Sequence, residues 1–138
     1  MQHPVCGIDV SATTLDVCIL PADPGESVQT ETVANARHAL PGLSETLRAA
    51  GVQLVVMEAT GGYEQRVAEH LTARALPVAV VNPSQVRHFA KGLGHRAKTD
   101  RIDAAILARF ARVVHPKPHR GAAPVIAQFR ALQTRLHQ

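Results

Sequence analysis

The chain has 138 residues, a formal net charge of +4, and 46% hydrophobic but only 3% aromatic residues. This length suffices for one domain, whose core must be built from Val, Leu, Ile and Ala. No apolar run reaches the ~18 residues of a membrane span, and the opening residues, MQHPVCGIDV, lack the pattern of a signal peptide. We therefore expect a cytoplasmic protein without a membrane partner, in which Cys6 and Cys18 are reduced, buried thiols.

The start of the chain predicts three strands with short connections. Residues 5–11, VCGIDVS, are apolar enough for a buried strand, and residues 14–20, TLDVCIL, predict a second strand after a tight turn. Two prolines and a glycine around Asp23 mark another turn, and residues 27–35 alternate as a third strand does. Three such strands make an antiparallel meander.

The pattern then changes to alternating helices and strands. A helix that ends at Gly51 precedes two further buried strands, and a helix follows each of them. The expected elements are helix 36–51, strand 52–59, helix 61–75, strand 77–82, helix 83–94 and a helix from about Thr99 to Val114. This order predicts an α/β domain with a mixed sheet, in which three antiparallel strands precede parallel ones and helices cover both faces.

Three segments of the chain are expected to have different roles. Residues 1–114 form the α/β domain, and residues 115–124, HPKPHRGAAP, have the proline content of a linker. Residues 125–138 begin a helix with an apolar side, which stops without a cap. We expect this helix to belong to a longer protein.

Charge is distributed unevenly along the chain. Residues 1–86 carry a net charge of −5, whereas residues 87–138 carry +9. This asymmetry favours a polyanion, and nucleic acid in particular, as the partner of the second half. The residues expected to contact its phosphates are Arg87, Lys91, Arg96 and Lys98. Each of them alone is equally compatible with a solvated basic surface.

The only two acidic residues of that basic half are Asp100 and Asp103. One interpretation is helix capping, with Asp100 as the N-cap and Asp103 three residues on, in the manner of a capping box. The other interpretation is metal binding, because residues three apart lie on one helix face, about 5–6 Å apart at Cβ. The two residues alone do not distinguish these interpretations.

Two further acids lie in or at the end of predicted buried strands. Asp9 interrupts the apolar strand VCGIDV, where a charge is costly unless it is paired or binds metal. Glu58 ends the strand QLVVM, and ligands collect at the carboxyl ends of strands in α/β sheets. Four carboxylates that met over the sheet would repel one another unless cations neutralised them. Two Mg²⁺ ions about 4 Å apart are the usual solution, and phosphodiester chemistry is their usual task.

Three motifs together resemble a known family. GIDVS, VVMEATGGYE and VNPSQVRHFAKGLGHRAKTDRIDA are similar to the N-terminal domain of the DEDD transposases of bacterial insertion sequences, the insertion-sequence 110 family, which includes the Piv DNA invertases. The resemblance covers roughly residues 5–112 and implies a ribonuclease H-like fold like that of the Holliday-junction resolvase RuvC. It also implies a catalytic tetrad that binds Mg²⁺, or Mn²⁺ in its place: Asp9, Glu58, Asp100 and Asp103.

The resemblance further implies an activity and its partners. Members of this family cut and rejoin donor and target DNA during transposition, guided by a bridge RNA, so a homo-oligomer in the bacterial cytoplasm, associated with the nucleoid, is expected. In this family a helical coiled coil and a second domain follow, so residues 125–138 would begin the coiled coil. The nucleophile is a serine of that second domain, so residues 1–138 would hold only half of a composite active site. The alternative function is a non-catalytic module for nucleic-acid binding and dimerisation, in which the four acids have no catalytic role.

Overall fold

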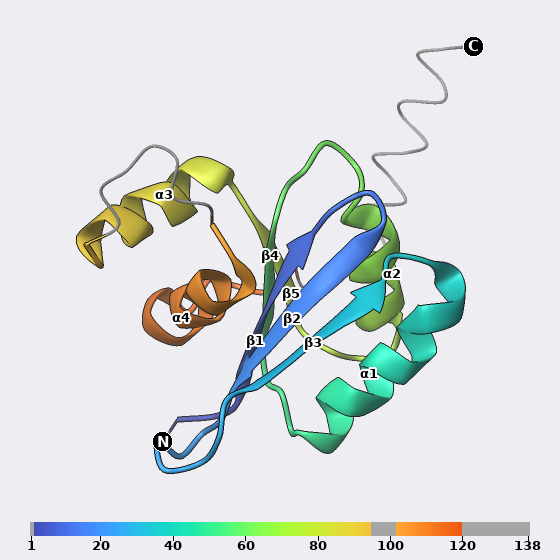
Figure 1. Ribbon diagram of the computed structural model, residues 1–138, viewed down its shortest axis with the longest axis horizontal. Helices are drawn as coiled ribbons and strands as arrows, with labels where there is room; N and C mark the ends of the chain where they lie inside the picture. The colour runs from blue at the N-terminus through green and yellow to red at the C-terminus, as the bar shows by residue number, and fades with distance from the viewer. Residues whose placement is uncertain (1, 95–101, 120–138) are drawn as a thin grey trace.

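The computed structural model describes residues 2–94 and 102–119. Within these residues the strands form one five-stranded mixed sheet of order β3-β2-β1-β4-β5 (Figure 1). The first three strands pair antiparallel, whereas β4 and β5 run parallel to β1, as predicted. The strands are β1 (Val5–Val10), β2 (Thr14–Leu20), β3 (Gln29–Ala34), β4 (Val55–Glu58) and β5 (Val78–Val81).

Helices cover both faces of this sheet. The helices of the described residues are the short 3-10 helix η1 (Arg37–Ala39), α1 (Leu40–Ala49), α2 (Gln65–Ala73), α3 (Pro83–Gly92) and α4 (Ala104–Val114). Figure 1 shows α1 and α2 on one side of the sheet and α3 and α4 on the other. None of the helices in the described part of the chain is long and apolar enough to span a membrane.

Two hydrophobic cores lie on the two sides of the sheet. One includes Ile8 of β1 with Leu43 of α1 and Leu71 of α2, and the other includes Val56 of β4 with Leu107 of α4. Because side chains alternate along a strand, every residue of β1 is buried on one face or the other. The predicted α/β architecture with helices on both faces is therefore confirmed. Cys6 and Cys18 are buried free thiols, also as predicted.

The last described helix begins later than the sequence predicts. α4 starts at Ala104 rather than near Thr99, and Asp103 precedes it in an extended conformation, with φ −108° and ψ 178°. The Asp103 carboxylate caps the helix by accepting a hydrogen bond from Ile106 N–H at 2.9 Å. The prediction that Asp103 lies inside the first helical turn is therefore wrong. The predicted cap Asp100 lies outside the described residues.

The buried face of α4 does not extend to the end of the helix. Val113 is 65% exposed, whereas Leu107 and Ala111 are fully buried. The buried face is centred on Leu107, which packs over β1, and Val113 lies outside it.

The first residues of the predicted linker lie against the sheet. The backbone N–H of His119 donates a hydrogen bond to the carbonyl of Val78 at 2.8 Å, and its Nε2 lies 3.1 Å from the carbonyl oxygen of Val80. Both partners belong to β5, the edge strand. The linker boundary at 115–124 and the coiled-coil helix at 125–138 remain predictions, because residues 120–138 lie outside the described part.

Candidate active site

The register of the parallel β1–β4 pair places Asp9 and Glu58 at the same end of two neighbouring strands. Gly7 of β1 is paired with Val56 of β4 in the parallel ladder. Asp9 and Glu58 each lie two residues further on, so both side chains belong to the face covered by α3 and α4, at the carboxyl ends of neighbouring strands. Asp9 is buried and Glu58 is half-buried. The sequence prediction that these two acids meet at one edge of the sheet is consistent with this geometry.

The electrostatics of Glu58 reflect this proximity. Burial raises the pKa of Glu58, and the nearby charge of Asp9 raises it further, while Arg87 of α3 acts in the opposite direction. Moreover, Glu58 Oε2 is buried and has no hydrogen-bond partner among the described residues. A buried carboxylate oxygen without a partner is rare, because its desolvation is uncompensated, and a bound cation would provide the compensation.

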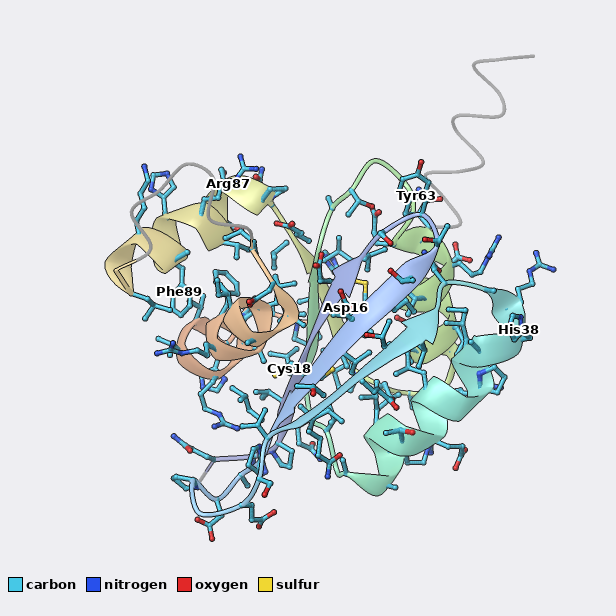
Figure 2. The ribbon with its side chains drawn as sticks, viewed as in Figure 1. Asp16, Cys18, His38, Tyr63, Arg87 and Phe89 are labelled. Atoms are coloured by element: carbon cyan, nitrogen blue, oxygen red, sulfur yellow. The ribbon has the colours of Figure 1, made fainter. Side chains whose placement is uncertain are left out.

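On its other side, Asp9 faces Asp16. The two residues lie directly opposite each other in the antiparallel β1–β2 pair, where Cβ atoms are about 4.5–5.5 Å apart. Asp16 Oδ1 accepts a hydrogen bond from Thr32 Oγ1 at 2.7 Å. Figure 2 shows Asp16 on the sheet. Asp16 was not among the predicted site residues, although the tight turn after residue 10 places positions 9 and 16 opposite each other in a hairpin.

Asp9, Asp16 and Asp103 line one cavity of about 370 Å³, here called the acidic cavity. Its full lining is Asp9, Asp16, Val17, Cys18, Thr30, Glu31, Thr32, Asp103, Ala104 and Ala105. Asp103 faces the sheet there: burial raises the pKa of the Cys18 thiol, and the charge of Asp103 raises it further. Asp103 therefore combines the capping role with a position beside Asp9, so the two interpretations of this residue are compatible.

Gly7 sets the distance between α4 and the sheet. A Cβ atom at Gly7 would collide with the carbonyl oxygen of Ala104, the nitrogen of Ala108 and the carbonyl carbon of Leu107. The helix backbone therefore packs directly on β1, which requires glycine at this position. Because Asp103 is the cap of the same helix, this close packing also brings its carboxylate to the acidic cavity.

These residues fit a divalent cation, although they do not form a closed cage. Among residues 2–94 and 102–119, no group of three or more His, Cys, Asp or Glu is arranged to hold a metal ion. Mg²⁺ does not require one, since it usually retains several waters and takes one or two carboxylates from the protein. Asp9 and Glu58 supply that number, and the unsatisfied Oε2 of Glu58 is the kind of atom that Mg²⁺ binds. The fourth predicted ligand, Asp100, lies outside the described residues.

Two of the four residues predicted to contact nucleic acid lie in the described part of the chain. Arg87 and Lys91 are exposed on α3 and lie four residues apart, so they share one side of the helix. Arg87 is near enough to Glu58 to lower its pKa, and Figure 2 shows it on α3. Asn82 caps the start of this helix, because its Oδ1 accepts a hydrogen bond from Ser84 N–H at 2.8 Å. Arg96 and Lys98 lie outside the described residues.

A mixed sheet of this order, with helices on both faces, defines the ribonuclease H-like fold of RuvC. The structure of Thermus thermophilus RuvC matches with a TM-score of 0.59 and 20% identity, over 83% of this chain and 99% of that one. The same protein in complex with a Holliday junction substrate matches with a TM-score of 0.54 and 18% identity, over 84% of this chain and 99% of that one. The predicted RuvC-like fold is therefore confirmed.

Sequence comparison identifies the family. The family model for DEDD transposases of the insertion-sequence 110 type, described as a transposase, matches residues 6–138, and the chain belongs to this family. Two relatives are the pilin gene-inverting proteins of Moraxella lacunata and Moraxella bovis, each 29% identical over 120 residues. The match covers 84% of this chain but 36% of each relative, so the chain spans about a third of their length.

Proposed function

We propose that this chain is the metal-binding catalytic domain of a transposase that cuts and rejoins DNA phosphodiesters in the bacterial cytoplasm. One observation carries the proposal: a buried carboxylate oxygen of Glu58 without a hydrogen-bond partner, beside Asp9, at the carboxyl ends of two parallel strands. Membership of the DEDD transposase family supports the reaction class.

Asp9 and Glu58 would hold Mg²⁺, and the family resemblance adds Asp103 and Asp100 to this ligand set. Bound there, the ion would stabilise negative charge on the attacking and leaving oxygens of a phosphodiester. Asp9 and Glu58 belong to neighbouring strands of the sheet, whereas Asp103 precedes α4. The cap hydrogen bond to Ile106 N–H fixes the orientation of Asp103.

Arg87 and Lys91 would bind the phosphates of the polynucleotide. Both are exposed on α3, and Arg87 is near enough to Glu58 to lower its pKa. A phosphate held by Arg87 would therefore lie on the same side of the sheet as the carboxylates. The +9 charge of residues 87–138 supports binding of both DNA and a guide RNA. A homo-oligomer is part of the same proposal, since donor and target strands must be brought together.

Family resemblance also supports a composite active site in which the nucleophile comes from another domain. Residues 1–138 would then bind metal and nucleic acid without recombining DNA on their own. The assay is strand exchange on supercoiled plasmid, with Mg²⁺ and guide RNA, by this chain and by a full-length family member. Efficient exchange by residues 1–138 alone would overturn the composite site.

The experiment that tests the metal centre is calorimetric titration of the 138-residue chain with Mn²⁺. Asp9→Asn and Glu58→Gln should each weaken binding strongly, because each removes one negative ligand next to the other. The matched control is Glu45→Gln, which removes the same charge from an exposed position of α1. Equal affinity in the three variants would contradict the metal centre. Nucleic-acid binding that persists without any metal binding would instead favour the non-catalytic binding module.

A further inference from the structure

Asn35, which follows β3, connects the two loops that leave the candidate active site. Its Nδ2 donates one hydrogen bond to the carbonyl of Ser11 at 2.8 Å and another to the carbonyl of Tyr63 at 3.1 Å. Its backbone N–H donates a third to the carbonyl of Thr13 at 3.0 Å. Ser11 lies two residues after Asp9, and Tyr63 lies in the loop after Glu58. One side-chain amide thus ties the end of β1 to the loop that follows β4.

Glu64 holds the same β4–α2 loop from inside. Its Oε2 accepts hydrogen bonds from Thr60 Oγ1 at 2.6 Å, Gly62 N–H at 3.1 Å and Thr60 N–H at 3.2 Å. The Glu64 side chain is buried, with 8% exposure. Burial acts to raise the pKa of Glu64, but these hydrogen bonds outweigh it and leave the pKa below its usual value. Glu64 is therefore an ionised, internal anchor of the loop.

The loop needs such anchors because its own backbone is permissive. Gly61 and Gly62 have φ values of +87° and +132°, and a Cβ at either one would meet nothing within 4 Å. Tyr63 at the tip is 56% exposed. In Figure 2 it lies at the end of the sheet where the β1–β2 hairpin and the β4–α2 loop meet. Asn35 and Glu64 supply side-chain hydrogen bonds that hold this loop next to the hairpin.

These anchors oppose a specific force. Two carboxylates on adjacent strand ends repel each other, and before a cation binds, that repulsion favours separation of the ends of β1 and β4. The pairing of β1 with β4 ends at Ile8 and Met57, one residue before the two acids. Asn35 and Glu64 act beyond this point, on the loops that follow Asp9 and Glu58.

We propose that Asn35 and Glu64 are positioning residues, which hold the ends of β1 and β4 together so that Asp9 and Glu58 stay adjacent before a divalent cation binds. The proposal rests on the proposed metal centre, and it assigns to both residues the role of outer partners that orient ligands. Loss of such partners typically lowers metal affinity about 10- to 100-fold.

The experiment compares Asn35→Ala and Glu64→Ala with two matched controls in the 138-residue chain. Gln29→Ala truncates an exposed amide at the other end of β3, and Glu45→Ala removes an exposed carboxylate from α1. Two quantities are measured: the Mn²⁺ affinity by calorimetry and the hydrogen-exchange rates of the backbone amides of Thr60 and Gly62 without metal. Both anchor variants should lose about 10- to 100-fold in affinity, and in Glu64→Ala the two amides should exchange faster, whereas the controls should match wild type.

A third variant separates the charge of Glu64 from its hydrogen bonds. It also provides the test if the alanine variants do not fold. Glu64→Gln retains an accepting oxygen of similar position, so it should recover most of the amide protection and part of the Mn²⁺ affinity. Wild-type affinity in Glu64→Gln combined with wild-type amide exchange would show that the charge is dispensable and would overturn the role of Glu64 as an ionised anchor.

The results distinguish failure of this inference from failure of the metal centre. Faster exchange in the anchor variants with unchanged Mn²⁺ affinity would overturn the positioning role, because the loop would then be merely structural. Unchanged amide exchange in Glu64→Ala would overturn the anchor itself. Absence of Mn²⁺ binding in the wild-type chain would contradict the metal centre on which the positioning role depends, and the exchange measurement would still decide whether the anchors hold the loop.

Discussion

Gly7 of β1 lies directly beneath the backbone of Ala108 in α4, so close that no Cβ atom fits between strand and helix. This contact also affects the positions of two acids. The N-cap of the helix is Asp103, and the next residue of β1 on the same face is Asp9. The distance between helix and sheet therefore sets the distance between two of the candidate metal ligands.

Substitution of Gly7 tests this coupling. Gly7→Ala should destabilise the fold by about 1–3 kcal/mol, because the methyl group must push the α4 backbone away from β1. It should also weaken Mn²⁺ binding, because Asp103 moves with the helix. The control is Gly42→Ala in α1, where an added Cβ meets nothing within 4 Å, so this variant should be neutral or more stable by up to about 1 kcal/mol. Thermal unfolding and metal titration of both variants provide the measurement.

The two roles of Asp103 are separable with a pair of substitutions. Asp103→Asn keeps an oxygen that accepts the hydrogen bond from Ile106 N–H, so the stability of the metal-free protein should change little. Asp103→Ala removes the cap and should cost about 1 kcal/mol. Both variants should lose Mn²⁺ affinity. Unimpaired binding by Asp103→Asn would leave capping as the sole function of this residue.

Glu58 should make the stability of the metal-free protein depend on pH. Its pKa is raised by burial and by Asp9, so the folded state binds the proton more tightly than the unfolded state. Stability should therefore fall as pH rises from about 4.3, the ordinary Glu value, through the raised pKa. Glu58→Gln should be more stable than wild type at pH 7, and the difference should vanish below about pH 4. Denaturant unfolding across this range measures it, and a constant difference would contradict the pKa argument.

The basic residues of α3 should bind phosphates of nucleic acid and thereby release the counterions of those phosphates. Replacement of Arg87 and Lys91 by Ala should weaken binding of duplex DNA and reduce the salt-dependence slope by up to about two units, one for each lost phosphate contact. The control is Arg37→Ala, which removes an exposed cation from η1, on the opposite side of the sheet. An unchanged slope in the double variant would show that these residues do not face phosphate.

Hydrophobic patterning predicts most of this fold, because each buried strand and each apolar helix face leaves a periodic signal in the sequence. Asp9 and Glu58 are also predictable, since charges in or at the end of apolar strands are rare and costly. Two other features are not predictable from hydrophobic patterning. The start of α4 at Ala104 is determined by the cap at Asp103, whereas the sequence offers Asp100 as an equally suitable cap. The link from Asn35 to Ser11 and Tyr63 spans 24 and 28 residues, and no local pattern reports it.

The hydrogen bonds from His119 to Val78 and Val80 have a practical consequence for the solution behaviour of the domain. β5 is a short apolar strand at the edge of the sheet. The unpaired backbone groups of an edge strand are a template for pairing with other chains. His119 shields part of this edge, because it forms hydrogen bonds with two carbonyl groups of β5. A version of the protein that stops at Val114, after the last described helix, would expose that edge and should self-associate. One that extends through His119 should stay monodisperse at the same concentration in sedimentation measurements.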